Sequence, residues 1–242
     1  NLKVSKKVDF GYYLEDKFGD EVLLPNSDVK NHDIKEGDKL EVFIYRDSKD
    51  RMISTLKKPY ITVGQIGYLE VVSQREIGAF VDIGLGRDLF IPLKEQSFKL
   101  KDGKKYLFYM YTDKTDRLAG TTKIDSYLDL AEEGKFKVSD EVKAIVYDTC
   151  ENGTLNVAID GKYRGLILAN EHFDYIYPGQ EIDVRVKRIY EDGTLGVTTR
   201  KKRLDAREEL SQKILQYLKE NGGFMPFNDK SSSEDIKADR MW

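Results

Sequence analysis

Short runs of apolar and aromatic residues recur along the chain, and glycine, aspartate and lysine separate them. In one run Ala79, Val81 and Ile83 alternate with Phe80 and Asp82, which is the two-residue period of a strand with one buried face. The neighbouring runs are rich in β-branched and aromatic residues, which also favour strands. The pattern predicts five short strands in this part of the chain, at residues 67–72, 79–83, 89–92, 105–111 and 117–122.

The same arrangement occurs three times along the sequence. A glycine opens the second run at Gly11, Gly78 and Gly153, so the first two copies are 67 residues apart and the second and third are 75 apart. A later turn keeps nearly the same interval, because Gly37 and Gly103 are 66 residues apart. Nearly constant spacing with one longer link is typical of tandem domains.

Five short strands per copy, with no helix long enough to connect parallel strands, indicate small closed Greek-key barrels. The first copy has its own five runs, at residues 2–8, 11–15, 21–24, 39–45 and 51–56. We predict a mostly β protein of three tandem five-stranded OB-fold barrels, the fold of many oligonucleotide- and oligosaccharide-binding proteins. The predicted boundaries are 1–58 (copy one), 59–127 (copy two) and 136–203 (copy three), followed by a small α-helical module at 204–242.

The last part of the chain changes to a helical pattern. Residues 204–219 place apolar side chains at helical spacing, and the sequence Asn221-Gly222-Gly223 ends the predicted helix. A serine run with acidic residues at 231–236 is typical of the start of a second helix. One amphipathic helix cannot bury its apolar face alone, so these residues predict a small α-helical module.

The composition of the chain indicates the cellular compartment in which it works. The chain has 40% hydrophobic residues and a single cysteine, Cys150, which cannot form an internal disulfide. No charged-then-apolar leader and no long apolar run occur in the sequence. We therefore expect a soluble protein of a reducing compartment, the cytoplasm, with no membrane association. The chain begins at Asn1 without a methionine, which leaves open what precedes it.

Charge argues against strong binding to nucleic acids. The formal net charge is −3, and residues 59–127 carry ten basic and nine acidic side chains. Because phosphate neutralisation supplies most non-specific affinity, such modules bind weakly unless their cations cluster. Copy three has two clusters, Arg185 with Lys187 and Arg188, and Arg200 with Lys201. A run of charges is more often a solvated face, so phosphate contact is the second interpretation of these clusters.

The sequence lacks the combinations of residues that common enzymatic mechanisms require. The two histidines, His32 and His172, are not at metal-ligand spacing from each other or from Cys150. Asp113 and Asp116 could hold a divalent cation, but turn formation explains them better. No glycine-rich loop opens a helix to hold a phosphate. We predict no catalytic residue, no metal and no cofactor.

The residues of copy two resemble a known RNA-binding repeat. Residues 77–84, residues 88–92 and a last strand ending in Lys123 are similar to the repeat of ribosomal protein S1. Copy three resembles the other half of that pattern, at residues 163–167, 179–186 and 193–201. Three such barrels followed by the segment 226–232 resemble the conserved virulence factor B family. This resemblance implies a bacterial RNA-binding regulator with a winged-helix domain after the barrels. Residues 204–242 would form only part of that domain, because the recognition helix and the β-wing do not occur before Trp242.

The resemblance also implies which side chains face the RNA. In this family bases stack on aromatic residues of the Gly-centred turn and of the third strand, which here are Phe10, Tyr13, Phe80 and Phe90. The cations expected near phosphates are Lys57, Lys123, Arg164, Arg185, Lys187, Arg188, Arg200 and Lys201. In copy three the aromatic positions are predicted to hold Asn152, Leu155 and Leu168, so this copy is expected to be structural. Without the resemblance, packing would be the more common role of an aromatic ring on a small barrel.

Two classes of function remain open from the sequence. The first is a regulator that holds single-stranded RNA on copies one and two, with DNA a further partner of the C-terminal module. The second is a protein-interaction scaffold, bound to the ribosome or to a nuclease, in which the barrels keep their fold but bind RNA weakly. Saturable, salt-sensitive binding of single-stranded RNA distinguishes the first class from the second.

Overall fold

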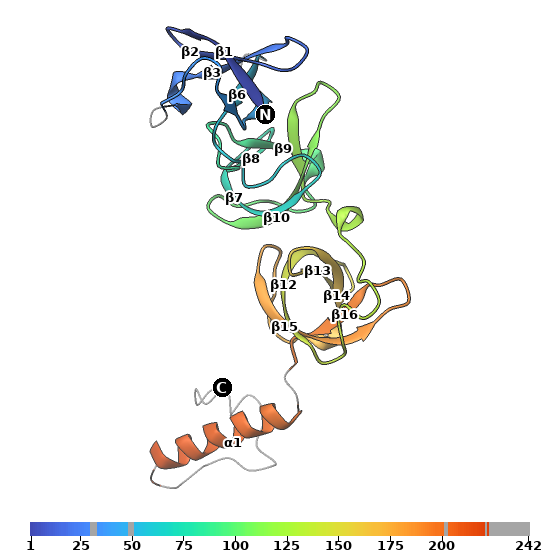
Figure 1. Cartoon of the computed structure of the whole chain (residues 1–242). Coiled ribbons are helices and arrows are strands. Elements are labelled where there is room, and N and C mark those ends of the chain that lie inside the picture. Colours follow the sequence, from blue (N-terminus) through green and yellow to red (C-terminus); the bar gives the residue numbers. More distant parts are fainter. Residues whose placement is uncertain (30–32, 48–50, 201–202, 221, 223–242) are drawn as a thin grey trace. The chain divides into compact units, whose positions relative to one another are not determined.

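A computed structural model describes residues 1–29, 33–47, 51–200, 203–220 and 222 (Figure 1). The chain divides into two units, Asn1–Thr199 and Arg200–Trp242, and we describe each by itself. The first unit contains the three predicted copies and consists of strands with short 3-10 turns. The predicted mostly β architecture is confirmed.

Copy two is a closed barrel of five strands (Figure 1). The third and fifth strands are parallel, and every other pair is antiparallel, which is the predicted OB-type topology. The fourth strand closes the barrel, because its first half pairs with the first strand and its second half pairs with the fifth. The elements are β7 (Ile66–Arg75), β8 (Gly78–Val81), β9 (Leu89–Pro92), η2 (Leu93–Glu95), β10 (Lys105–Thr112) and β11 (Leu118–Thr121).

Copy three is a closed five-stranded barrel with the same connectivity. It follows a linker that contains the short turn η3 (Asp125–Tyr127). Its first and fourth strands have nine residues each and pair along five of them. The elements are β12 (Glu141–Thr149), β13 (Leu155–Ile159), β14 (Tyr163–Ile167), η4 (Ala169–Glu171), β15 (Glu181–Ile189) and β16 (Leu195–Thr198).

Copy one departs from the predicted closed five-stranded barrel. It is a six-stranded sheet in the order β4-β1-β2-β3-β6-β5. The fourth strand predicted at 39–45 is broken at Glu41 and Val42, so that its two pieces pair with opposite edges of the sheet. The elements are β1 (Leu2–Val8), β2 (Gly11–Glu15), β3 (Glu21–Pro25), η1 (Asn26–Asp28), β4 (Lys39–Leu40), β5 (Phe43–Arg46) and β6 (Met52–Thr55).

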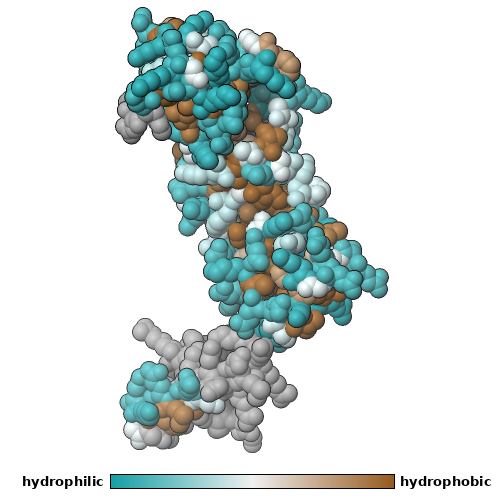
Figure 2. Space-filling model, in the orientation of Figure 1, coloured by the Kyte–Doolittle hydropathy of each residue, from teal (hydrophilic) through white to brown (hydrophobic). Residues whose placement is uncertain are grey.

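Each copy buries its own apolar core, formed by alternate residues of its strands. The core of copy two includes Phe108 and Met110 of β10, both fully buried. A further cluster joins copy two, the linker and copy three, because Leu107, Ile124 and Tyr147 pack together in it. The outer surface that Figure 2 shows for residues 1–199 is largely hydrophilic, with smaller apolar patches.

The second unit contains one described helix, α1 (Arg203–Glu220). This confirms the helix predicted at residues 204–219. The second helix predicted from the serine run at 231–236 lies outside the described residues. Among the described residues, no helix is long and apolar enough to cross a membrane.

Candidate nucleic-acid interface

Two phenylalanines lie side by side on the outside of copy two. Phe80 in β8 is directly opposite Phe90 in β9, and their ring centroids are 5.4 Å apart with 43° between the ring planes. The strand neighbours Ala79 and Val81 are buried, because successive side chains of a strand point to opposite faces. Both phenylalanines are half-buried on the outer face of the strands, so the outward orientation predicted for Phe80 is confirmed.

Copy one presents a comparable aromatic group. Tyr13 in β2 is half-buried, and Phe10 packs against it edge-on with 6.5 Å between ring centroids. The Nζ of Lys6 lies 4.6 Å from the Tyr13 ring centroid and also forms an ion pair with Glu21 at 3.3 Å. Leu23 of β3 is directly opposite Tyr13, where copy two has its second ring. Copy one therefore offers two adjacent rings with a cation beside them.

The strand registers show which residues are equivalent in the three copies. Each first strand has one bulge, and the residue before the bulge pairs with a core residue of the second strand. The residue that precedes this core partner faces outward, and it is Tyr13, Phe80 or Asn156. Its direct partners on the third strand are Leu23, Phe90 and Leu166.

This register corrects the sequence alignment of copy three. The alignment placed the aromatic positions at Asn152, Leu155 and Leu168, but Leu155 is a core residue that is 1% exposed. The error comes from Gly153, which has φ +80° and lies in a five-residue loop before β13 rather than at the start of the strand. The corrected outward residues are also non-aromatic, so copy three has no ring pair at this place.

Copy three instead has a hollow on the equivalent face. The hollow has a volume of about 630 Å³, and its lining includes Asn156, Leu166, Arg188 and Tyr190. The guanidinium carbon of Arg188 lies 5.5 Å from the Tyr190 ring centroid, within the range of a cation–π contact. Arg188, predicted to contact phosphate, is therefore exposed on the same face as the aromatic positions of the other copies.

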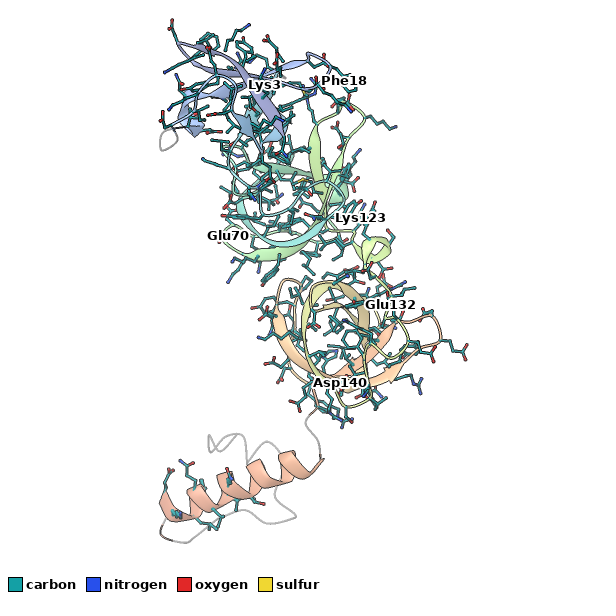
Figure 3. The ribbon with its side chains drawn as sticks, viewed as in Figure 1. Lys3, Phe18, Glu70, Lys123, Glu132 and Asp140 are labelled. Carbon is teal, nitrogen blue, oxygen red and sulfur yellow. The ribbon has the colours of Figure 1, made fainter. Side chains whose placement is uncertain are left out.

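An exposed cation follows the last strand at an equivalent place in each copy. Lys57, Lys123 and Arg200 each stand four residues after the residue that pairs with the third strand. The Nζ of Lys123 donates a hydrogen bond to the carbonyl oxygen of Lys94 in η2, directly after the strand that carries Phe90 (Figure 3). The predicted cation of copy two thus lies at the end of the strand that carries the ring.

Other predicted cations of copy three have acidic partners. Arg164 forms an ion pair with Asp125 at 2.9 Å, and Lys187 forms one with Glu171 at 2.5 Å. The Glu171 side chain is 7% exposed, so its charge needs a close partner. Arg164 is thus paired with a carboxylate of the linker before copy three, and Lys187 with a carboxylate of copy three itself.

Two further basic residues, Arg185 and Lys201, were predicted to lie near phosphates. Arg185 lies in β15, opposite Glu141 of β12 and Thr198 of β16, and is half-exposed. Lys201 lies outside the described residues. The register therefore places Arg185 between two neighbouring strands of the barrel.

The histidines were predicted to have no catalytic role. The Nε2 of His172 lies 2.9 Å from the carbonyl oxygen of Gly153, so the ring joins two loops of copy three. His32 lies outside the described residues. Within the described part of the chain, no group of three or more His, Cys, Asp or Glu side chains is arranged to hold a metal ion.

Asp88 precedes Phe90 by two residues and has an unfavourable electrostatic environment. Burial raises the pKa of its carboxyl group, and the nearby Asp82 raises it further. A carboxyl group whose pKa is higher in the folded state stabilises the fold below its unfolded pKa, and this contribution is lost as the pH rises through the folded value. We expect Asp88→Asn to remove this loss.

At pH 7 we expect Asp88→Asn to melt about 1–2 °C above the unmodified chain. This shift corresponds to a gain of less than about 1 kcal/mol in the free energy of unfolding. The difference should vanish below about pH 4, where the unfolded carboxyl group is also protonated. Calorimetry at both pH values measures it. The exposed Asp174→Asn serves as the control, and an equal rise for both variants would contradict the explanation.

The closed five-stranded barrel with an outward pair of rings defines the class of the protein, a tandem S1-type domain protein of the OB fold. The sequence matches the S1 domain family over residues 1–57 and 63–123. It matches the CvfB-like winged helix domain family over residues 212–239. Copy three lies outside the S1 matches and yet folds as a closed barrel with the same connectivity.

Similar proteins cover almost the whole chain. The uncharacterized protein YitL of Bacillus subtilis is 31% identical over 98% of this chain and 80% of that protein. Conserved virulence factor B of Staphylococcus haemolyticus is 26% identical over 93% of this chain and 78% of that protein. The crystal structure of a multidomain protein with nucleic acid binding domains from Streptococcus pneumoniae is similar with a TM-score of 0.58 and 27% identity, over 99% of this chain and 86% of that chain. The chain belongs to the conserved virulence factor B family.

Proposed function

We propose that this protein binds single-stranded RNA and regulates RNA processing, stability or gene expression. The observation that carries the proposal is the outward pair of Phe80 and Phe90, two half-buried rings in contact on neighbouring strands. Unpaired bases stack on such rings, which recognise single strands without regard to sequence. The S1-type family and the Streptococcus pneumoniae protein described as having nucleic acid binding domains support this proposal.

The proposed binding path runs over copies one and two. Each exposed base that stacks on an aromatic ring contributes about 1–3 kcal/mol. Lys57 and Lys123 follow the last strands of these copies and supply charge for phosphates. Because the chain has a net charge of −3, we propose binding that relies on stacking and that weakens with salt.

The proposal includes the module division and the cellular setting. We propose four modules, 1–58, 59–127, 136–203 and 204–242, with the last contacting DNA or extending the RNA path. The lone Cys150 favours a reducing compartment such as the cytoplasm. The proposed role is binding, without a catalytic step, as befits the S1 and winged-helix domains that the sequence matches.

Titration of the whole chain with fluorescently labelled single-stranded RNA, at 50 and 200 mM salt, tests the proposal. We expect saturable binding, with a slope of log affinity against log salt of about −0.7 for each phosphate that is neutralised. Single-stranded DNA and double-stranded RNA of the same length serve as comparisons, and both are expected to bind more weakly. Absence of saturable binding at 50 mM salt would contradict the proposal.

One observation favours a second candidate, a protein-interaction scaffold. Arg164 and Lys187 of copy three are neutralised by Asp125 and Glu171, so they are not available as free charges for phosphate. A protein whose barrel surfaces bind a protein partner instead of RNA needs no exposed cations on those surfaces. Such a scaffold should give no salt-sensitive RNA binding in the titration described above.

A further inference from the structure

A cleft lies where copies two and three meet within residues 1–199, and neither Phe80 nor Phe90 lines it. Its volume is about 810 Å³, a size typical of ligand sites. Copy two contributes β7, β10 and the loop before β10, and copy three contributes the loop before β15. We call it the junction cleft. Its aromatic lining consists of Tyr68, Phe98, Tyr106, Tyr175 and Tyr177.

The positive charge of copy two is concentrated at this cleft. Lys99, Lys101, Lys104 and Lys105 all line it, and they are four of the ten basic side chains of residues 59–127. All four are exposed, and none forms an ion pair within the described part of the chain. A neutral module therefore has one strongly basic edge.

Acidic residues near the cleft only partly offset this charge. Asp102 accepts a hydrogen bond from the backbone N–H of Gln74 at 2.7 Å and is not among the lining residues. Glu181 forms an ion pair with Lys143 at 3.2 Å. Glu70 of β7, which Figure 3 labels, is directly opposite Lys105 in the sheet. Four lysines therefore face two glutamates, one of which already has a partner.

Copy three adds exposed rings to the cleft. Tyr175 is 90% exposed and Tyr177 is 48% exposed, with 6.4 Å between their ring centroids and 36° between the ring planes. Large exposed aromatic side chains beside lysines have no role in either core. Rings next to clustered cations are the two elements that a single nucleic acid strand requires, for its bases and for its phosphates.

The packing around the cleft holds the two sides together. The hydroxyl group of Tyr68 donates a hydrogen bond to the carbonyl oxygen of Gly179 at 2.6 Å. Gly179 has φ +89°, and a Cβ there would lie 2.5 Å from the carbonyl oxygen of Lys105. Only glycine allows this close approach between the two copies. The rings of one copy and the lysines of the other are thus held in a fixed relation.

We propose that the junction cleft is a second binding site for single-stranded nucleic acid, in which bases stack on Tyr175 and Tyr177 and phosphates lie along Lys99, Lys101 and Lys104. The inference rests on the proposed function for the kind of ligand, but uses a different surface from the ring pair on β8 and β9. It assigns copy three a role in binding through a surface other than its barrel face, where Asn156 and Leu166 replace the ring pair of copy two.

The test compares variants of the whole chain with a labelled single-stranded RNA long enough to cover both sites. Tyr175→Ala with Tyr177→Ala is expected to lower affinity at least about 5-fold, the low end of the loss for one stacked base. Lys101→Gln with Lys104→Gln should reduce the salt slope by about 1.4, since each lost phosphate contact removes about 0.7. The matched controls are Phe173→Ala, an exposed ring outside the cleft lining, and Lys135→Gln, an exposed lysine outside it.

The outcomes separate this inference from the proposed function. Photo-crosslinking with 4-thiouridine RNA, mapped to peptides, should give crosslinks at 175–177 as well as at the ring pair. Loss of binding in Phe80→Ala, with unchanged affinity and no crosslink in the cleft variants, would overturn the junction site and leave the proposed function standing. Loss in the cleft variants alone supports the junction site and overturns the ring pair. No binding of any single strand overturns both.

Discussion

Replacing Phe80 by alanine is expected to weaken binding of single-stranded RNA by about 1–3 kcal/mol, which is roughly 5- to 150-fold. The ring lies outside the buried core and packs on Phe90 of the adjacent strand, so its truncation removes a stacking surface without opening the core. Phe90→Ala should have a similar effect. The two rings are in contact, so the double variant should lose less than the sum of the single losses.

Fluorescence anisotropy at low salt measures these affinities, and far-UV circular dichroism checks that each variant folds. Phe18→Ala is the matched control, because this ring is 78% exposed but lies in the turn between β2 and β3 of copy one (Figure 3). The control should bind as the unmodified chain does. Affinities of the Phe80 and Phe90 variants equal to that of the control would show that the pair is surface packing and no base platform.

The strands could be predicted from the sequence where alternation is strong. The bounds predicted for β1, β2 and β9 agree with the structure, because apolar residues on one face and short polar turns define them locally. The prediction that copy one closes into a barrel was wrong, because the pairing of its fourth strand depends on tertiary contacts. Leu40 and Phe43 belong to one apolar run, but their strand partners are on opposite edges of the sheet, and the chain bends at Glu41 and Val42 between them.

The candidate site could be predicted only in part. The outward orientation of Phe80 follows from the two-residue period, which is a local property. The residues of copy three that are equivalent to Phe80 and Phe90 cannot be predicted in this way, because strand register depends on loop length. The loop before β13 has five residues, so Gly153 lies in the loop and not at the start of the strand. The ion pair of Arg164 with Asp125 joins a strand to the linker before the barrel, a contact that no spacing rule predicts.

The junction cleft illustrates the same limit. Its lysines and its exposed tyrosines, Tyr175 and Tyr177, come from segments about 70 residues apart in the sequence, and neither segment alone indicates a binding site. Only the fold brings Tyr175 and Tyr177 to the lysines of the other copy. Composition suggested a neutral module, whereas the structure shows that its charge is unevenly distributed.

Replacing Gly78 by alanine is expected to destabilise copy two by about 2–5 kcal/mol, from backbone strain and overpacking together. Gly78 opens β8 with φ +152°, a conformation that favours glycine, and a Cβ there would lie 2.3 Å from the carbonyl oxygen of Ile91. The same Cβ would lie 2.8 Å from the ring of Phe90. The substitution should therefore lower RNA affinity as well, because the ring has to move.

Differential scanning calorimetry of the whole chain, together with the RNA titration, checks both effects. Gly86→Ala is the control, because no atom lies within 4 Å of the position of its added Cβ and it should change neither stability nor affinity. Copy three tolerates Thr154 at the equivalent position, where a five-residue loop replaces the two-residue turn before β8. If Gly78→Ala were as stable as the control, the close approach of β8 to β9 would not be what positions Phe90. Loss of stability with unchanged affinity would separate the fold of copy two from its proposed binding face.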